Sequence, residues 1–390
     1  MPRLPAHPAY PCQPDARVRK FRLTGPARYP IHAGMKTRNR YPIASPWLIP
    51  DARDEATAKL VGLCDGRRTI GQVARQLERA GMRSEETLVL GERLGVIALA
   101  TGDMPFLNTL CAETWGGLLF EGAKIRGVSP SAHLADLKTH YRELSKYLQV
   151  PPEEIHRLFH ASFAGDAPGN VGRAASNPGR LLRAIWRRYE SDAYLARRHL
   201  IHFHGLTSGL LFSRAVARLR SLRGGRPAIR LLDAGCGDGV LMRRVFQAFG
   251  RNCRVFGVDI GWNVLKFARF VDRERGARSG DVLRGDAERL PFRQGIFDLV
   301  CCFEVLEHLP SPESALEAFH RVLTPGGALL ASWSSGTNLM SGHVSAAGPE
   351  QVRKTLESAR FRVERLEYLP GAQTTFIEAR RLRAAAKPRR

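Results

Sequence analysis

One short stretch of this 390-residue chain constrains its fold more than any other. An apolar segment, 229–234, carries Asp233 near its end and gives way to three glycines at alternate positions, Gly235, Gly237 and Gly239. Because glycine has no side chain, the backbone there can adopt positive φ and bring main-chain amides close to a bound molecule. We therefore predict a strand, a nucleotide-binding turn and a following helix.

The same strand, turn and helix unit recurs further along the chain. The segments 254–259 and 296–302 are apolar and are predicted as strands, and acidic residues follow the strand ends at Asp259, Asp286 and Glu304. A carboxylate in the first of these places can accept hydrogen bonds from both hydroxyls of a ribose. This alternation predicts an α/β fold with a parallel sheet that has helices on both faces.

This ordered block resembles the class I S-adenosylmethionine-dependent methyltransferases, and within them the small-molecule enzymes of the ubiquinone-biosynthesis type. The resemblance covers 205–380 and implies a Rossmann-like seven-stranded sheet that uses S-adenosylmethionine as its cofactor. It implies that the glycines lie under the methionine moiety, that Asp259 binds the ribose, and that Asp286 contacts the adenine amino group. The cofactor-binding residues that we expect are Asp233, Gly235, Gly237, Gly239, Asp259, Asp286, Ala287 and Glu304.

Three side chains just beyond the fourth strand are the expected catalytic residues, namely Glu304, Glu307 and His308. An oxygen or nitrogen nucleophile can need a base, and His308 can accept a proton near neutral pH; the structural alternative is that Glu307 and His308 only brace a helix. Their spacing is also similar to the Glu-x-x-Glu-His metal cluster of quinone O-methyltransferases and small-RNA 2′-O-methyltransferases. Many metal-free relatives share these letters, so no metal is expected.

The segment 44–101 carries a second, smaller pattern. A helix is predicted over 55–64, and a capping box at Thr69 and Gln72 opens a second helix. A third helix begins at Ser84 and leads into a short strand over 96–99. The pattern predicts a small winged-helix-like α+β domain.

The run from Ala58 to Thr69, with 94–97, resembles the peptide-binding chaperone of pyrroloquinoline quinone biosynthesis. Relatives of that domain serve as leader-peptide recognition elements, which implies that an extended peptide adds to a sheet edge beside the third helix. The segment 17–41, where that family has its leading strands, is only weakly strand-like. A domain that forms a homodimer, covers the substrate pocket or binds DNA remains an alternative.

The remaining parts are predicted from composition and local pattern. The predicted division of the chain is a flexible basic segment over 1–43, the small domain over 44–101, a helical connector and lid over 102–204, the methyltransferase domain over 205–380 and a basic tail over 381–390. The connector has predicted helices over 129–148 and 151–162, a loop over 165–179 and an amphipathic stretch over 181–222. In that stretch, lid or helix-surface positions are favoured over metal ligation for His199, His202 and His204.

The net charge and the cysteines limit which partners, bound metals and cellular location we expect. A net charge of +23 can attract an anionic partner, but no basic motif interleaved with aromatic residues appears, so nucleic-acid binding is not favoured. The seven cysteines contain no Cys-x-x-Cys pair and predict neither a disulfide framework nor a zinc site. No signal peptide is apparent, and the apolar region 95–120 contains Asp103 and Glu113, so no membrane span and a cytoplasmic location are expected.

The primary functional hypothesis is transfer of a methyl group from S-adenosylmethionine to an oxygen, nitrogen or carbon nucleophile. The expected acceptor is a ribosomal peptide, with a leader peptide as partner, or a specialised metabolite. An RNA methyltransferase and a catalytically inactive peptide-binding or scaffold protein are the alternatives.

Overall fold

The computed structural model of the chain describes residues 40–44, 55–93, 96–164, 189–204, 206–223, 228–336, 343–369 and 373–382. The predicted loop over 165–179 and the basic tail after 382 lie outside them, as does nearly all of the predicted amino-terminal segment. The described residues form two compact units, divided between Glu143 and Leu144, with His204–Leu206 grouped with the first. This division falls inside the segment predicted as a connector.

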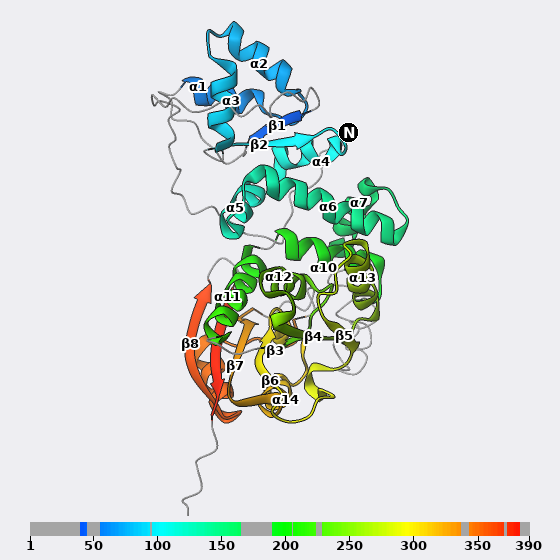
Figure 1. Ribbon diagram of the computed structural model, residues 1–390, viewed down its shortest axis with the longest axis vertical. Helices are drawn as coiled ribbons and strands as arrows, with labels where there is room; N and C mark the ends of the chain where they lie inside the picture. The colour runs from blue at the N-terminus through cyan, green and yellow to red at the C-terminus, as the bar shows by residue number, and fades with distance from the viewer. Residues whose placement is uncertain are drawn as a thin grey trace, which may run out of the picture. The chain divides into compact units, whose positions relative to one another are not determined.

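The first unit begins with three helices and a two-stranded antiparallel sheet (Figure 1). The helices are α1 (Glu55–Leu63), α2 (Ile70–Arg79) and α3 (Ser84–Arg93), and the strands are β1 (Arg40–Ala44) and β2 (Ile97–Thr101). Their apolar faces meet in a small core whose fully buried members are Leu60, Val73, Leu77, Val96 and Ile97. The three predicted helices are confirmed, whereas a winged-helix fold stays a prediction.

Local chemistry explains where these elements begin. Thr69 and Gln72 form the predicted capping box, in which Thr69 Oγ1 accepts from Gln72 N and Gln72 Oε1 accepts from Thr69 N. Strand β1 is the central strand of this part, because Ala44 N donates to Cys64 O (2.8 Å) on the side away from β2. A regular strand therefore forms at the end of a region that the sequence marks only weakly as extended.

Further helices complete the first unit and open the second. They are α4 (Pro105–Leu110), a π-helical turn (Cys111–Trp115), α5 (Gly116–Arg126), α6 (Pro130–Leu148) and α7 (Pro152–Ala164). The predicted stretch over 181–222 is divided into α10 (Asp192–His204) and α11 (Leu206–Arg223). Within the described ranges, no helix is long and apolar enough to cross a membrane.

The second unit contains the predicted seven-stranded sheet, in the order β5-β4-β3-β6-β7-β9-β8. Figure 1 shows it from β5 on the right to β8 on the left. The strands are β3 (Ile229–Ala234), β4 (Cys253–Asp259), β5 (Asp281–Arg284), β6 (Phe297–Cys302), β7 (Leu323–Ser334), β8 (Phe361–Leu369) and β9 (Thr374–Arg381). Strand β9 runs antiparallel to both of its neighbours, β7 and β8, and the other strand pairs are parallel. The strand order reverses at β3, and a crevice for ligands forms at the carboxyl ends of strands at such a point.

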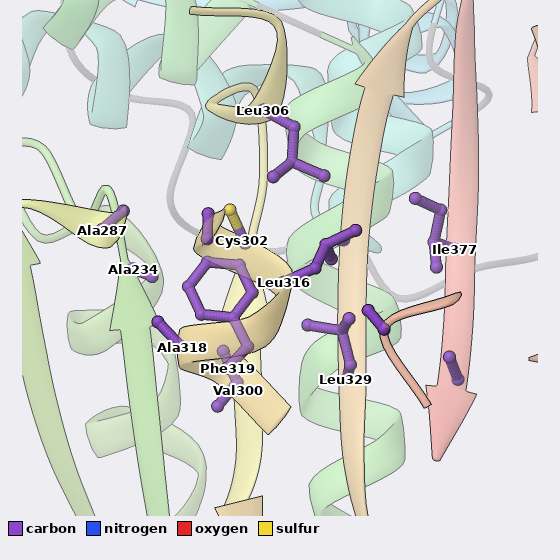
Figure 2. Packing of buried hydrophobic residues seen from close by; sticks show 14 of the residues in the cluster. Ala234, Ala287, Val300, Cys302, Leu306, Leu316, Ala318, Phe319, Leu329 and Ile377 are labelled. Atoms are coloured by element: carbon purple, nitrogen blue, oxygen red, sulfur yellow. The ribbon is translucent and has the colours of Figure 1, made fainter. Parts of the chain in front are cut away.

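Helices cover both faces of this sheet. On one face, α11, α12 (Val240–Phe249) and α13 (Trp262–Glu274) bury apolar residues against the strands. On the other, α14 (Pro312–Val322) and α15 (Pro349–Ser358) do the same. Figure 2 shows Leu316 and Phe319 of α14 packed near Val300 and Cys302 of β6. The Rossmann-like α/β prediction is confirmed.

Candidate functional site

The glycine loop joins β3 to α12 as predicted. Gly235 has a φ of +79° and Gly237 a φ of +54°, a region that side chains disfavour, and Gly239 caps the start of α12. A Cβ built on Gly235 would lie 2.2 Å from Val305 Cγ2, so no side chain fits there. The N–H of Gly235 donates to Val258 O (2.7 Å), which fixes the loop against β4. This gives a rigid turn that presents backbone rather than side chains to a ligand.

Asp259 ends β4 directly beside this loop. Its two carboxylate oxygens accept hydrogen bonds from Gly237 N (2.8 Å) and Gly261 N (2.9 Å). An ionised carboxylate has about four acceptor positions, so these bonds orient the group and leave acceptor capacity over. The arrangement fits the predicted ribose contact.

Asp286 and Ala287 lie at the neighbouring strand end, where Gly285 N donates to Asp259 O (3.0 Å). Asp286 caps a short 3-10 turn by accepting from Glu288 N (2.9 Å). Ala287 is buried in the apolar core, so its methyl group packs inward and its backbone is what a ligand can reach. The adenine contact predicted for these residues stays a prediction.

Asp233 is a buried carboxyl at the foot of the loop. Among the described residues its Oδ2 has no hydrogen-bond partner. Burial is the main reason that the pKa of Asp233 is raised to about 7, and nearby Asp259 and Asp238 act in the same direction against Arg198. A buried, unsatisfied acceptor beside the loop fits a cationic group of a ligand.

Glu304 follows β6 in a left-handed conformation, with a φ of +56°. Its backbone N donates to Ser332 Oγ (2.8 Å), and that hydroxyl donates to Glu304 Oε1 (3.0 Å). A non-glycine residue in this conformation costs about 1 kcal/mol or more, and such strain gathers at functional sites. Burial raises the pKa of Glu304.

Glu307 lies three residues on, in a 3-10 turn (Leu306–His308). Its carboxyl is fully buried, and neither oxygen has a hydrogen-bond partner in the described part of the chain. Burial, and then the charge of Glu304, raises the pKa of Glu307 well above its ordinary value. A buried carboxyl without partners is costly, so this one is placed to meet a proton donor or a cation.

His343 joins Glu307 and His308 from a loop before α15. The carbonyl of Glu307 accepts from Val344 N (2.7 Å), and the rings of His308 and His343 lie 5.0 Å apart between centroids. One ligand atom from each of Glu307, His308 and His343 lies within 4.8 Å of the other two. Two imidazoles and a carboxylate fit a divalent transition ion as well as a shared proton. The structure thus groups two of the expected catalytic residues with a histidine that sequence reasoning did not single out, and Glu304 is outside that group.

Helix α10 also contributes to the loop. His199 Nδ1 hydrogen-bonds Asp238 Oδ2 inside the protein, and Arg198 Nη2 donates to Gly235 O (3.0 Å). His202 stacks on Phe212 with ring centroids 5.5 Å apart, and burial lowers its pKa to about 3. His199 therefore holds α10 to the glycine loop through Asp238. His199 and His202 are both buried, so the helix-surface position predicted for them is wrong. No pattern in the sequence indicated Arg198.

The sheet edge predicted to receive a leader peptide is covered within the first unit. Ser131 Oγ on α6 accepts from Leu99 N (2.8 Å) and donates to Glu92 of α3 (2.8 Å). Lys138, also on α6, donates to Thr101 O (2.7 Å). The outer edge of β2 is therefore hydrogen-bonded to side chains, and strand addition there requires these contacts to break.

Comparison with known proteins agrees with this geometry. Residues 232–331 match a family described as a methyltransferase domain. The chain is similar to the ubiquinone biosynthesis O-methyltransferase of Pseudomonas aeruginosa (strain UCBPP-PA14), with 38% identity over 111 residues, or 28% of this chain and 46% of that protein. It is also similar to the protein of the same name from Leptothrix cholodnii, with 31% identity over 161 residues, or 40% of this chain and 66% of the relative.

Among solved structures, a SAM-dependent methyltransferase from Aquifex aeolicus superimposes with a TM-score of 0.34 and 20% identity, over 42% of this chain and 88% of that one. The chain spans less than half of the length of the Pseudomonas relative, whose matched share is 46%. The family match runs from the end of β3 into β7 and so includes the glycine loop, Asp259 and Asp286. The match therefore identifies a methyltransferase domain in this chain, built around the glycine loop.

Proposed function

We propose that the protein transfers the methyl group of S-adenosylmethionine to a hydroxyl group of a specialised metabolite. The observation that carries the proposal is the buried, unpartnered carboxyl of Glu307 beside His308 and His343. This group lies next to the cofactor loop, because Val305, two residues before Glu307, is the residue that contacts Gly235.

The bound cofactor supplies an already activated methyl group, so the protein must hold the acceptor in line and manage one proton. Asp259 and Asp233 are oriented toward the loop and would hold the donor. Glu307, His308 and His343 would either take the proton from the acceptor hydroxyl or hold a divalent ion that lowers the pKa of that hydroxyl. The strained Glu304 would fix the segment between the two sites.

Two features support a small hydroxylated acceptor over the other hypotheses. The covered edge of β2 is unfavourable for a peptide that binds by strand addition. Several arginines on the β8 and β9 side of the sheet are paired with glutamates, which reduces the charge available to RNA there. The intact loop and Asp259 weigh against an inactive scaffold.

The test is methyl incorporation from labelled donor into phenolic and hydroxylated metabolites extracted from the native source. We expect Glu307→Gln to lower transfer about 100-fold or more, while binding of S-adenosylhomocysteine stays within about threefold because Glu307 lies outside the loop. Glu313→Gln, an exposed position on α14, is the matched control and should keep full activity. Full activity in Glu307→Gln would contradict the proposal.

Treatment with a chelator distinguishes the two roles that Glu307, His308 and His343 could have, namely proton acceptance and metal binding. If the cluster holds an ion, chelation should abolish transfer in the wild type and added divalent metal should restore it. If the cluster acts as a base, chelation should have no effect while Glu307→Gln remains impaired.

A further inference from the structure

Two histidines face each other on α7, a helix that precedes the 232–331 segment matched by the methyltransferase family. His156 and His160 are four residues apart, so their side chains lie on one face of the helix in successive turns. Their Nε2 atoms are 3.1 Å from each other, and their rings meet edge to face with centroids 4.3 Å apart. Two ring nitrogens are therefore directed at one point beside α7.

The distance between these nitrogens fits a metal ion. Zinc binds imidazole nitrogen at about 2.0–2.1 Å, so an ion held equally by two nitrogens 3.1 Å apart makes an angle of about 95–102° with them. That angle lies between adjacent ligands of a square-planar or octahedral ion, at about 90°, and those of a tetrahedral ion, at about 109°. Zinc, nickel and copper take imidazole in these geometries, whereas magnesium and calcium prefer oxygen ligands.

The surroundings of the pair also suit a cation. Burial, and then the neighbouring His160, lowers the pKa of His156 to about 4, so that its ring is uncharged at neutral pH, which is the form that binds metal. Both histidines are only partly buried, which leaves room for water to complete the coordination of an ion. The adjacent cation is compensated, because Arg157 Nε donates to Glu154 Oε2 (2.7 Å).

We propose that His156 and His160 chelate a divalent transition ion, which links two successive turns of α7. The site uses none of the residues of the Glu307 cluster and does not depend on the proposed methyl transfer. It offers two of the four protein ligands of a structural zinc site, which predicts a dissociation constant for zinc of about 1–200 μM.

Calorimetric titration of the full chain with zinc chloride tests the proposal. His156→Ala and His160→Ala should each weaken this binding event about 100-fold or more. The double variant should lose no more than either single variant, because a chelate needs both nitrogens at once. Alanine is the best helix former, so these substitutions preserve α7, and unchanged helical circular dichroism checks this.

The combination of His160→Ala with Ala161→His is the matched control. It keeps the number of imidazoles but moves one of them to the exposed neighbouring position, away from His156, so it should not restore zinc binding. Glu307→Gln should leave this binding event unchanged, which distinguishes it from an ion held by the Glu307 cluster.

Labelling with diethyl pyrocarbonate locates the bound ion. Trypsin cleaves after Lys146, Arg157 and Arg173, so His156 and His160 are the single histidines of two different peptides. At a zinc concentration about ten times the dissociation constant, the labelling rates of both peptides should fall about tenfold, and magnesium should have no such effect. Wild-type zinc affinity in His160→Ala, restored binding in the matched control, or protection of one peptide alone would overturn the chelate.

Discussion

A methyl group added at position 235 tests the packing that shapes the cofactor loop. Gly235 has a φ of +79°, and alanine in that conformation costs about 1 kcal/mol. The new Cβ would also lie 2.2 Å from Val305 Cγ2 and 3.2 Å from its Cγ1. Overpacking of this kind costs about 1–3 kcal/mol. Gly235→Ala should therefore lower the free energy of unfolding by about 2–4 kcal/mol in total.

Differential scanning calorimetry measures this loss directly. For a unit of this size each 1 kcal/mol lowers the melting temperature by about 2–4 °C, so we expect a fall of about 4–16 °C. Gly239→Ala is the control within the same loop, because its φ is +78° but the nearest atom to its Cβ is Arg243 Nη1 at 3.3 Å. Gly239→Ala should therefore lose free energy of unfolding through its left-handed backbone conformation and little through steric contact.

The difference between the two variants isolates the contact with Val305. Adding Val305→Ala to Gly235→Ala should recover part of the loss, whereas the same addition to Gly239→Ala should only destabilise further. Equal melting temperatures for Gly235→Ala and Gly239→Ala would refute the inference that Val305 leaves no room for a side chain at position 235.

Two further predictions follow from buried groups around the loop. Because burial raises the pKa of Asp233 from 3.8 to about 7, the native chain keeps a proton in this range that the unfolded chain has released, and the free energy of unfolding should fall as pH rises through it. Urea titrations should show that slope reduced in Asp233→Asn, and unchanged slopes would contradict the assignment. Burial also raises the pKa of the Cys236 thiol well above its ordinary value, so peptide mapping after iodoacetamide treatment should find it alkylated only in denaturant. Rapid labelling in the native chain would count against its burial.

Local signals in the sequence were sufficient for the elements that build the donor side. The bounds of β3 coincide with the apolar run over 229–234 that predicted it, because the glycine turn closes that run. The capping box likewise fixed the start of α2. The carboxylates at the ends of β4 and β5 fall beside one another because parallel strands place their carboxyl ends at one edge.

The acceptor side could not be predicted in this way. His343 reaches His308 because Val344 N and Ser345 N dock on the carbonyl of Glu307, and no local pattern encodes a contact between segments so far apart. Arg198 and His199 reach the loop because of the way in which α10 packs on it, which periodicity does not specify. Sequence patterns determine which face of a helix is apolar, and they leave open which polar side chains it brings to a site.

The donor side and the acceptor side of the site differ in how freely their residues can change. The glycine loop and Asp259, which we propose to hold the donor, lie within the matched segment 232–331, and the loop glycines tolerate little change because their packing and backbone geometry exclude side chains. His343 and Arg198 lie outside that segment, on a loop and on a helix that the match does not cover. Substitution of His343 can alter the proton or metal chemistry at Glu307 while the loop and Asp259 stay in place. Similarity to quinone methyltransferases within the matched segment therefore constrains the donor far more than the acceptor, and the native substrate has to be sought through the cluster around Glu307.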